Sequence, residues 1–152
     1  MSTEMQTNHQ RHVALFLPYR IKDGALFVYL QKRTMDAPRA PGFFGLFGGG
    51  VEQGETPEQA FLREVEEELS YRPRSYRHLG RFDVDVKYLD VYVQQVETDF
   101  EARATVREGE YGRFFSEQEV MSEEKLSAWD KNIIMELYRT VRESEDGRGN
   151  LF

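Results

Sequence analysis

Six consecutive residues, Arg63-Glu64-Val65-Glu66-Glu67-Glu68, form the segment of this chain best suited to metal chemistry. In a helix, Glu64, Glu67 and Glu68 stand at i, i+3 and i+4 and share one face. Like charges on one face repel one another, and a cation among them removes that cost. Mg²⁺ and Mn²⁺ prefer carboxylate oxygens. The pattern therefore predicts a divalent-metal site, and the alternative is an acidic helix face that is merely solvated.

Three glycines, Gly48 to Gly50, precede the acidic segment. Glycine tolerates positive φ and lets the backbone approach a ligand closely. The main-chain carbonyl of Gly49, or that of its neighbour Gly48, is therefore a candidate metal ligand. Taken alone the glycines could form only a turn, but their position before the carboxylates favours a shared site.

Glu55 and Arg63 are the expected support of this site. Glu55 lies between the glycines and the helix, and Arg63 lies inside the helix beside Glu64. An ion pair between them would fix the loop against the carboxylate face. We therefore expect Glu55 and Arg63 to orient the site without taking part in the reaction.

The segment from Gly49 to Tyr71 resembles the Nudix box. Gly49, five residues, Glu55, seven residues and then Arg63 to Glu68 match its fixed positions. The last glycine of the box is Ser70 here, and Gly48 stands where many relatives have proline. These departures put the end of the helix and the stiffness of the loop in question, not the carboxylates.

The resemblance implies a fold, an activity and a cofactor. The expected fold class is α/β, a Nudix-type α/β/α sandwich with a mixed β-sheet. The expected activity is Mg²⁺-dependent hydrolysis of a pyrophosphate bond in a nucleoside diphosphate linked to another group, with Mn²⁺ as an alternative metal. A nucleoside triphosphate or oxidised nucleotide leads the substrate candidates, and nucleotide sugars, ADP-ribose and dinucleoside polyphosphates stay open. The alternative is a Nudix-like module that binds a nucleotide metabolite without turnover.

The resemblance also assigns roles to particular residues. The implied metal ligands are Glu64, Glu67, Glu68, Gly49 and Glu108. Glu108 matches a further glutamate that several relatives supply from a downstream loop, and Glu110 is the second choice for this position. The general base stays open among Glu64, Glu67 and Glu108, because a carboxylate within reach of the attacking water is the requirement.

Substrate contacts are expected outside the box. Arg33 matches an arginine that contacts phosphate in relatives, and Lys32 and Arg39 compete for this role. Asp130 matches a position that reads the base in some relatives, although an N-cap of the last helix is the favoured alternative. An aromatic residue could stack on the base or simply belong to the core. The candidates are Phe43, Phe44, Phe47 and Trp129.

Composition narrows the partners. The net charge of −7 argues against a nucleic-acid polymer, whose binding depends on basic patches, and leaves a small phosphorylated substrate bound through a metal. No apolar run approaches the length of a membrane span, and residues 1–11 lack the apolar core of a signal peptide. The absence of cysteine suits a reducing cytoplasm. The resemblance also makes a homodimer plausible.

The elements that must position these residues follow from pattern and turn chemistry. A hairpin of two strands is expected around Asp23-Gly24, then a loop, a capped helix and two long strands joined near Lys87 to Leu89. A short strand and two further helices are expected to follow. The expected elements are strands 12–19, 25–32, 76–86, 90–98 and 113–115 and helices 57–69 and 129–143, with a short helix capped by Ser116 and Glu119 and irregular chain at 34–45 and 103–112.

One domain accounts for the whole pattern. We expect it to span residues 12–143, with a flexible N-terminus at 1–11 and a flexible tail at 144–152. The sequence contains no repeat, linker or second hydrophobic unit that would indicate another domain.

Overall fold

The computed structural model describes the backbone of residues 10–150 and the side chains of residues 10–144. Its elements, in chain order, are β1 (Arg11–Lys22), β2 (Ala25–Lys32), β3 (Phe44–Gly45), β4 (Phe47–Gly50), α2 (Pro57–Leu69), β5 (Arg77–Val84), β6 (Lys87–Gln95), α3 (Phe100–Arg103), β7 (Tyr111–Ser116), α4 (Glu117–Ser122) and α5 (Ala128–Asn150).

The strands form one mixed sheet around β1. The principal order is β3-β2-β1-β6-β5, with β4 paired to β1 and β7 paired to β2. β1 runs parallel to β6 and antiparallel to β2 and β4. The expected hairpin is present, because Asp23 and Gly24 both take positive φ and turn β1 into β2.

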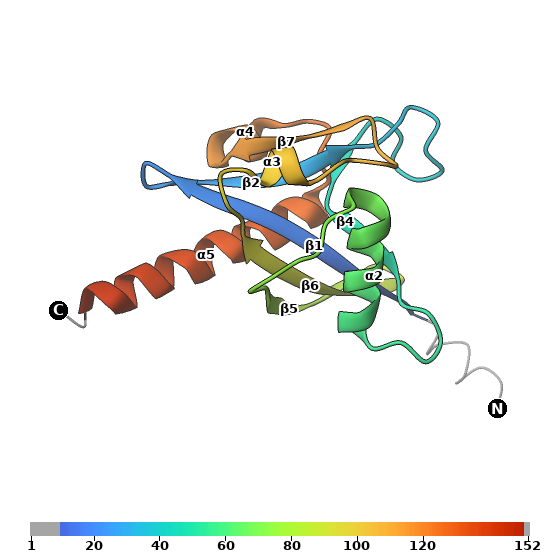
Figure 1. Cartoon of the computed structure of the whole chain (residues 1–152), viewed down its shortest axis with the longest axis horizontal. Helices are drawn as coiled ribbons and strands as arrows, with labels where there is room; N and C mark the ends of the chain where they lie inside the picture. The colour runs from blue at the N-terminus through green and yellow to red at the C-terminus, as the bar shows by residue number, and fades with distance from the viewer. Residues whose placement is uncertain (1–9, 151–152) are drawn as a thin grey trace.

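Helices cover both faces of the sheet, so the predicted α/β/α sandwich is confirmed (Figure 1). On one face Ala14 and Phe16 of β1 pack with Phe61 and Val65 of α2. On the other face Val13 and Leu17 belong to a core with Ile133, Ile134, Leu137 and Tyr138 of α5. The nearly continuous apolar run of β1 follows from this burial on both sides.

α2 begins and ends where the sequence predicts. Thr56 accepts from the backbone N–H of Gln59, whose side chain accepts from the N–H of Thr56, and Pro57 occupies the first turn. The helix ends at Ser70, which takes the left-handed conformation (φ 48°, ψ 41°) that a glycine adopts without strain. The missing glycine of the box therefore leaves the helix end unchanged.

A polar cluster joins three strands on the α2 face. The carboxylate of the buried Asp90 in β6 contacts the Nε2 atoms of His12 and His78 at 2.6 and 2.7 Å. Arg81 of β5 donates to the same carboxylate at 3.0 Å. Because a buried carboxylate needs partners, this cluster ties the starts of β1 and β6 to β5.

Several expectations about the elements were wrong in detail, since β4 was not predicted as a strand and the bounds of β1, β6 and β7 differ from the expected 12–19, 90–98 and 113–115. The turn between β5 and β6 lies at Asp85-Val86, where Asp85 takes positive φ, and not at Lys87 to Leu89. The loop expected at 34–45 ends in the short strand β3, and α3 was not predicted. The last helix extends to Asn150, beyond the expected end at residue 143. Short apolar segments and charged helix ends carry little periodic signal, which explains these misses.

The ends of the predicted domain need one correction. Arg11, assigned to the flexible N-terminus, is the first residue of β1, and its N–H donates to the carbonyl of Val86 at 2.9 Å. Residues 1–9 and 151–152 lie outside the described part of the chain, so the flexibility expected there stays a prediction. Among the described helices, none has the length and apolar character of a membrane span.

Candidate active site

Glu68 is the buried centre of the candidate site. Its side chain comes from the last turn of α2, and the residue is only 2% exposed. The backbone N–H of Gly48 donates to its two carboxylate oxygens at 3.1 and 3.3 Å. Burial, the charge of Glu108 and the neighbouring Glu64 raise the pKa of Glu68 to about 8. A cation placed here would favour the ionised form.

Glu64 lies beside Glu68 and against the glycine strand. A Cβ atom added to Gly49 would lie 2.6 Å from the carboxylate of Glu64, so any side chain there would displace this carboxylate. Gly48 has φ of +134°, and a Cβ atom there would lie 2.2 Å from the carbonyl oxygen of Ala14. The glycine run is therefore a strand that packs against β1 on one side and the carboxylates on the other.

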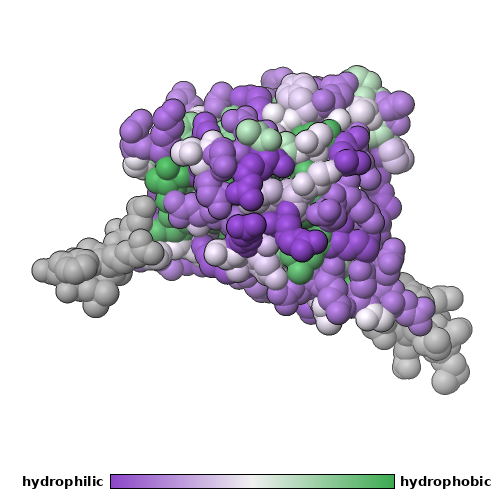
Figure 2. Space-filling model, viewed as in Figure 1, coloured by the Kyte–Doolittle hydropathy of each residue, from purple (hydrophilic) through white to green (hydrophobic). Residues whose placement is uncertain are grey.

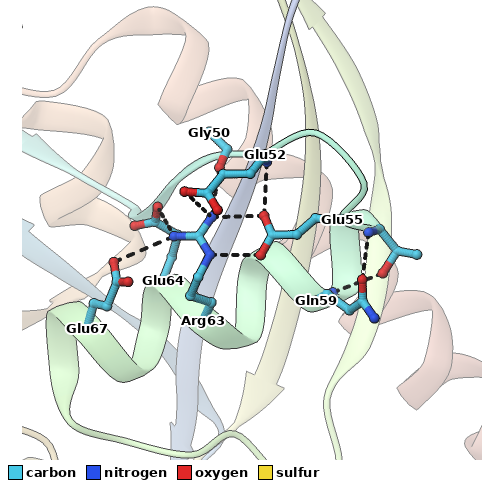
Figure 3. Close-up of polar contacts among 8 residues, drawn as sticks. Gly50, Glu52, Glu55, Gln59, Arg63, Glu64 and Glu67 are labelled. Atoms are coloured by element: carbon cyan, nitrogen blue, oxygen red, sulfur yellow. Dashed lines mark hydrogen bonds and ion pairs between the residues drawn. The ribbon is translucent and has the colours of Figure 1, made fainter.

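Arg63 connects α2, the glycine strand and the intervening loop (Figure 3). Its guanidinium donates to both carboxylate oxygens of Glu55, at 2.8 and 3.0 Å, so the expected pair is present. It also donates to the carbonyl of Gly50 at 3.1 Å and to Glu64 at 3.0 Å. The hydrogen bonds from Arg63 and from the N–H of Glu52 lower the pKa of Glu55 to about 2. Glu55 therefore stays ionised and holds Arg63 in place.

Glu67 lies at the outer edge of the site. Its side chain is 53% exposed, and its carboxylate faces Arg63 at 3.6 Å (Figure 3). The three carboxylates thus share one face of α2, as expected, but differ in depth: Glu68 is buried, Glu64 is 15% exposed and Glu67 is largely in solvent.

Two backbone hydrogen bonds bring Glu108 to the end of α2. The N–H of Arg107 donates to the carbonyl of Glu68 at 2.9 Å, and the N–H of Glu110 donates to the carbonyl of Lys32 at 2.8 Å. The loop is also tied by a hydrogen bond from Arg107 to the hydroxyl of Ser70. Glu108 is exposed, yet its charge is among the causes that raise the pKa of Glu68.

The carboxylates of this site suit a divalent cation, although they are not yet arranged as a complete coordination shell. Within residues 10–144, no three acidic or histidine side chains converge closely enough to hold a metal as they stand. Glu64 and Glu108 do lie close enough to Glu68 for both of their charges to raise its pKa. Neighbouring carboxylates in a mostly buried position are costly unless protonated or bound to a cation, so Glu64, Glu68 and Glu108 fit the expected metal.

A cavity of about 580 Å³ adjoins the glycine strand on the α5 side of the sheet. Its lining includes Gly48 and Gly49, and its volume suits a nucleotide-sized ligand. Trp129, 50% exposed, and the partly buried Phe43 provide aromatic surface, and Arg33 and Asp130 provide opposite charges. Four of the residues expected to contact substrate therefore line one cavity: Arg33, Phe43, Trp129 and Asp130.

The other candidates for substrate contact differ in whether they line this cavity. Arg39 and Phe44 also line the cavity, although Phe44 is buried against Phe115. Lys32 instead places its ammonium over the ring of Phe44, at 5.0 Å from the centroid. Phe47 is fully buried in the α2-side core and does not line the cavity.

Asp130 does not cap the last helix, so that favoured alternative was wrong. Ser127 accepts from the N–H of Asp130 at 3.1 Å and precedes the first residue of α5. Asp130 lies in the first turn with its side chain in the cavity, next to Gly45 and Arg33. Burial raises the pKa of Asp130 to about 6, against the opposing effect of Arg33.

Two cavity residues were not anticipated from the sequence. Arg11 and Lys87 lie at the starts of β1 and β6 and line the cavity together. Only the parallel pairing of these strands brings them side by side. The sequence did hold one signal for them. Side chains alternate between the two faces of a strand, so Arg11 shares a face with Val13, and Lys87 shares a face with Leu89.

A model of the NUDIX domain matches residues 8–137 of this chain. The chain belongs to the Nudix family. The 8-oxo-dGTP diphosphatase of Escherichia coli strain K12 is 29% identical over 91 residues, which cover 59% of this chain and 69% of that protein. Nudix membership and this relative together identify the chain as a Nudix pyrophosphohydrolase, a class that generally uses a divalent metal.

Solved structures agree with the fold. A mutT/nudix family protein from Listeria innocua superposes with a TM-score of 0.71 at 19% identity, covering 88% of this chain and 95% of that one. The NUDIX domain of NrtR from Shewanella oneidensis, solved in complex with ADP ribose, gives 0.70 at 17% identity, covering 93% and 99%. At these identities the likeness shows the Nudix sandwich and not the substrate.

Proposed function

We propose that this Nudix enzyme hydrolyses a pyrophosphate bond in a nucleoside diphosphate linked to another group, with Mg²⁺ as its metal and Mn²⁺ as a substitute. The observation that carries the proposal is the position of Glu64 and Glu68 beside a glycine strand that also borders a nucleotide-sized cavity. The phosphates would lie at Gly48 and Gly49, and the nucleoside would occupy the cavity.

The residues divide the work by position. Glu68, Glu64 and Glu108, with the carbonyl of Gly49, would hold the metal, and Glu67 would complete the set from its exposed edge. When bound, divalent ions offset phosphate charge and lower the pKa of a water. Arg33 would contact a phosphate oxygen from the cavity. The cytoplasm is the proposed location and a homodimer the proposed assembly, as expected from the sequence.

Glu108 is the best placed of the three candidate general bases. It is exposed and makes no ion pair with any side chain in residues 10–144, so its carboxylate is free to accept a proton from water. The carboxylates of Glu64 and Glu67 instead contact Arg63, at 3.0 and 3.6 Å. Glu64 and Glu67 remain the alternatives.

An oxidised nucleoside triphosphate is the leading substrate. The similarity to the Escherichia coli 8-oxo-dGTP diphosphatase supports this choice, and Trp129, Phe43 and Asp130 offer stacking and hydrogen bonding to a base. ADP-ribose, nucleotide sugars and dinucleoside polyphosphates are the next candidates. A binding module without turnover is disfavoured, because binding alone does not require the full carboxylate set.

The test is product analysis with a panel of these compounds, with Mg²⁺, with Mn²⁺ and with chelator. We expect metal-dependent cleavage that Glu68→Gln and Glu64→Gln reduce by at least about a hundredfold. Glu66→Gln is the matched control, because Glu66 is exposed on the same helix outside the carboxylate cluster. Unchanged turnover in Glu64→Gln and Glu68→Gln, or no cleavage of any compound by the wild type, would refute the proposal.

A further inference from the structure

Four cationic side chains line the cavity, and they are Arg11, Arg33, Arg39 and Lys87. Asp130 is the one carboxylate among the lining residues. Among the side chains of residues 10–144, none forms an ion pair with any of the four. The chain as a whole carries −7, so this local excess of positive charge runs against its overall balance. Figure 2 shows the face of the molecule that carries α2, on the other side of the sheet from this cavity, and this face is mainly hydrophilic.

Arg11 and Lys87 form one group. They are paired residues at the starts of the parallel strands β1 and β6, next to the apolar floor made by Val13 and Leu89. Lys87 is partly buried, and the guanidinium of Arg11 lies 3.6 Å from the position of a Cβ atom at Gly50. Two neighbouring cations at one end of a cavity repel each other unless an anion lies between them.

The other charged groups of the cavity and the neighbouring site have partners of opposite charge or a proposed role. The guanidinium of Arg33 and the carboxylate of Asp130 both lie next to Gly45, so they partly offset each other. The scissile pyrophosphate would lie at the glycine strand, beside the carboxylates and their metal. Lys87 also interacts with the charge of Asp130, but this single carboxylate faces both Lys87 and Arg33. The exposed Arg11 and the partly buried Lys87 together therefore keep an excess of positive charge that an anionic group of the ligand would match.

We propose that Arg11 and Lys87 bind a second phosphate, a monoester on the ribose of the nucleoside that occupies the cavity. The substrate class is then a nucleoside diphosphate linked to another group and phosphorylated also at its 2′ or 3′ position, and such a compound would replace the oxidised nucleoside triphosphate as the leading substrate. A phosphate monoester offers three acceptor oxygens and close to two negative charges, which suit one guanidinium and one ammonium. The inference rests on the proposed function for the nucleoside in the cavity and for the position of the scissile pyrophosphate.

Binding without turnover tests this directly. Adenosine and guanosine 5′-monophosphates are compared by calorimetry with their 2′,5′- and 3′,5′-bisphosphates, in chelator. We expect at least one bisphosphate to bind about tenfold more tightly than its monophosphate, one charge-assisted contact being of this order. Lys87→Gln and Arg11→Gln should each reduce the advantage to about threefold or less. Lys22→Gln, an exposed cation at the far end of β1, is the matched control and should keep it.

The other possible results of this binding experiment would refute either this inference or the proposed function. Equal binding of monophosphate and bisphosphate by the wild type overturns the inference, as does an advantage that survives both variants or falls equally in Lys22→Gln. Because the two substitutions are separate, one variant that fails to fold leaves the other as the test. A bisphosphate preference without hydrolysis of any compound would sink the proposed function alone, and hydrolysis without the preference would sink this inference alone.

Discussion

Single atoms decide the geometry at Gly49. A methyl group there would meet the carboxylate of Glu64 at 2.6 Å, too close for any real contact. We expect Gly49→Ala to displace Glu64 and to lower kcat by about tenfold or more, because small shifts of a catalytic group are costly. Steady-state kinetics would measure this.

Gly50→Ala is the control for that prediction. A Cβ atom at Gly50 would first meet Arg11 at 3.6 Å, an ordinary van der Waals distance, and its φ is not positive. Its kcat should stay within about twofold of the wild type. Equal losses in the two variants would contradict the steric argument and point to backbone stiffening in general.

Asp130 gives a pH dependence whose sign follows from its burial. Its pKa is about 6 in the folded protein against the ordinary 3.8, so the folded state holds the proton more tightly than the unfolded state. The stability linked to this group is therefore complete below about pH 4 and is lost as pH rises through 6. Two pKa units correspond to at most about 3 kcal/mol.

Replacing Asp130 by Asn removes the titrating group. The free energy of unfolding of Asp130→Asn relative to wild type should therefore rise between pH 4 and pH 6.5. Urea denaturation at a series of pH values measures this difference, in which the other titrating groups largely cancel. A difference that stays constant, or that falls with pH, would show that burial does not control this carboxyl.

At the scale of elements, Arg63 links α2 to the loop that precedes it and to the end of β4. It donates to Glu55, Gly50 and Glu64 with the planar fork of a guanidinium. Lysine keeps the charge but cannot make these contacts at once. We expect Arg63→Lys to lower kcat/KM by about tenfold or more, the usual effect of losing such a supporting contact.

Arg72→Lys is the matched substitution for that experiment. Arg72 is exposed just beyond α2, outside the contacts that Arg63 makes, and its variant should behave as wild type. Kinetics and thermal unfolding of both variants are needed. A loss of activity in Arg63→Lys that merely parallels a loss of stability would argue against a positioning role.

At the scale of the whole molecule, metal binding should appear as stability. Glu68 is buried in α2, so a cation bound there stabilises the folded chain and has no comparable site in the unfolded one. At a Mg²⁺ concentration a hundred times the Kd, the gain is about 2.7 kcal/mol. We expect Mg²⁺ to raise Tm, chelator to reverse the rise, and Glu68→Gln to abolish most of it.

Calcium and the exposed carboxylates provide the controls. Glu66→Gln should keep the full Mg²⁺-dependent rise in Tm, because Glu66 faces solvent. Ca²⁺, with its longer bonds and higher coordination number, tests how strictly the site selects its ion. A rise in Tm that Glu68→Gln leaves intact would place the bound metal elsewhere.

The sequence by itself determined what depends on neighbours along the chain. The start of α2 follows from Thr56, Pro57 and Gln59, and the shared face of the carboxylates follows from helical spacing. The family resemblance of the box added the sandwich and the pyrophosphohydrolase class, and the comparisons confirmed both. The pair of Glu55 and Arg63 could also be predicted, because Glu55 lies in the loop directly before the helix that carries Arg63.

Only the tertiary structure decided how these residues differ from one another. Helical spacing does not predict any difference in exposure among Glu64, Glu67 and Glu68. In the fold, packing against β4 buries Glu68 and leaves Glu67 in solvent. The cavity depends on strand pairing between distant segments, which brings Arg11 beside Lys87. Asp130 lines this cavity and does not cap α5. Burial and pairing between remote segments are properties of the whole fold, and local sequence does not encode them in a readable form.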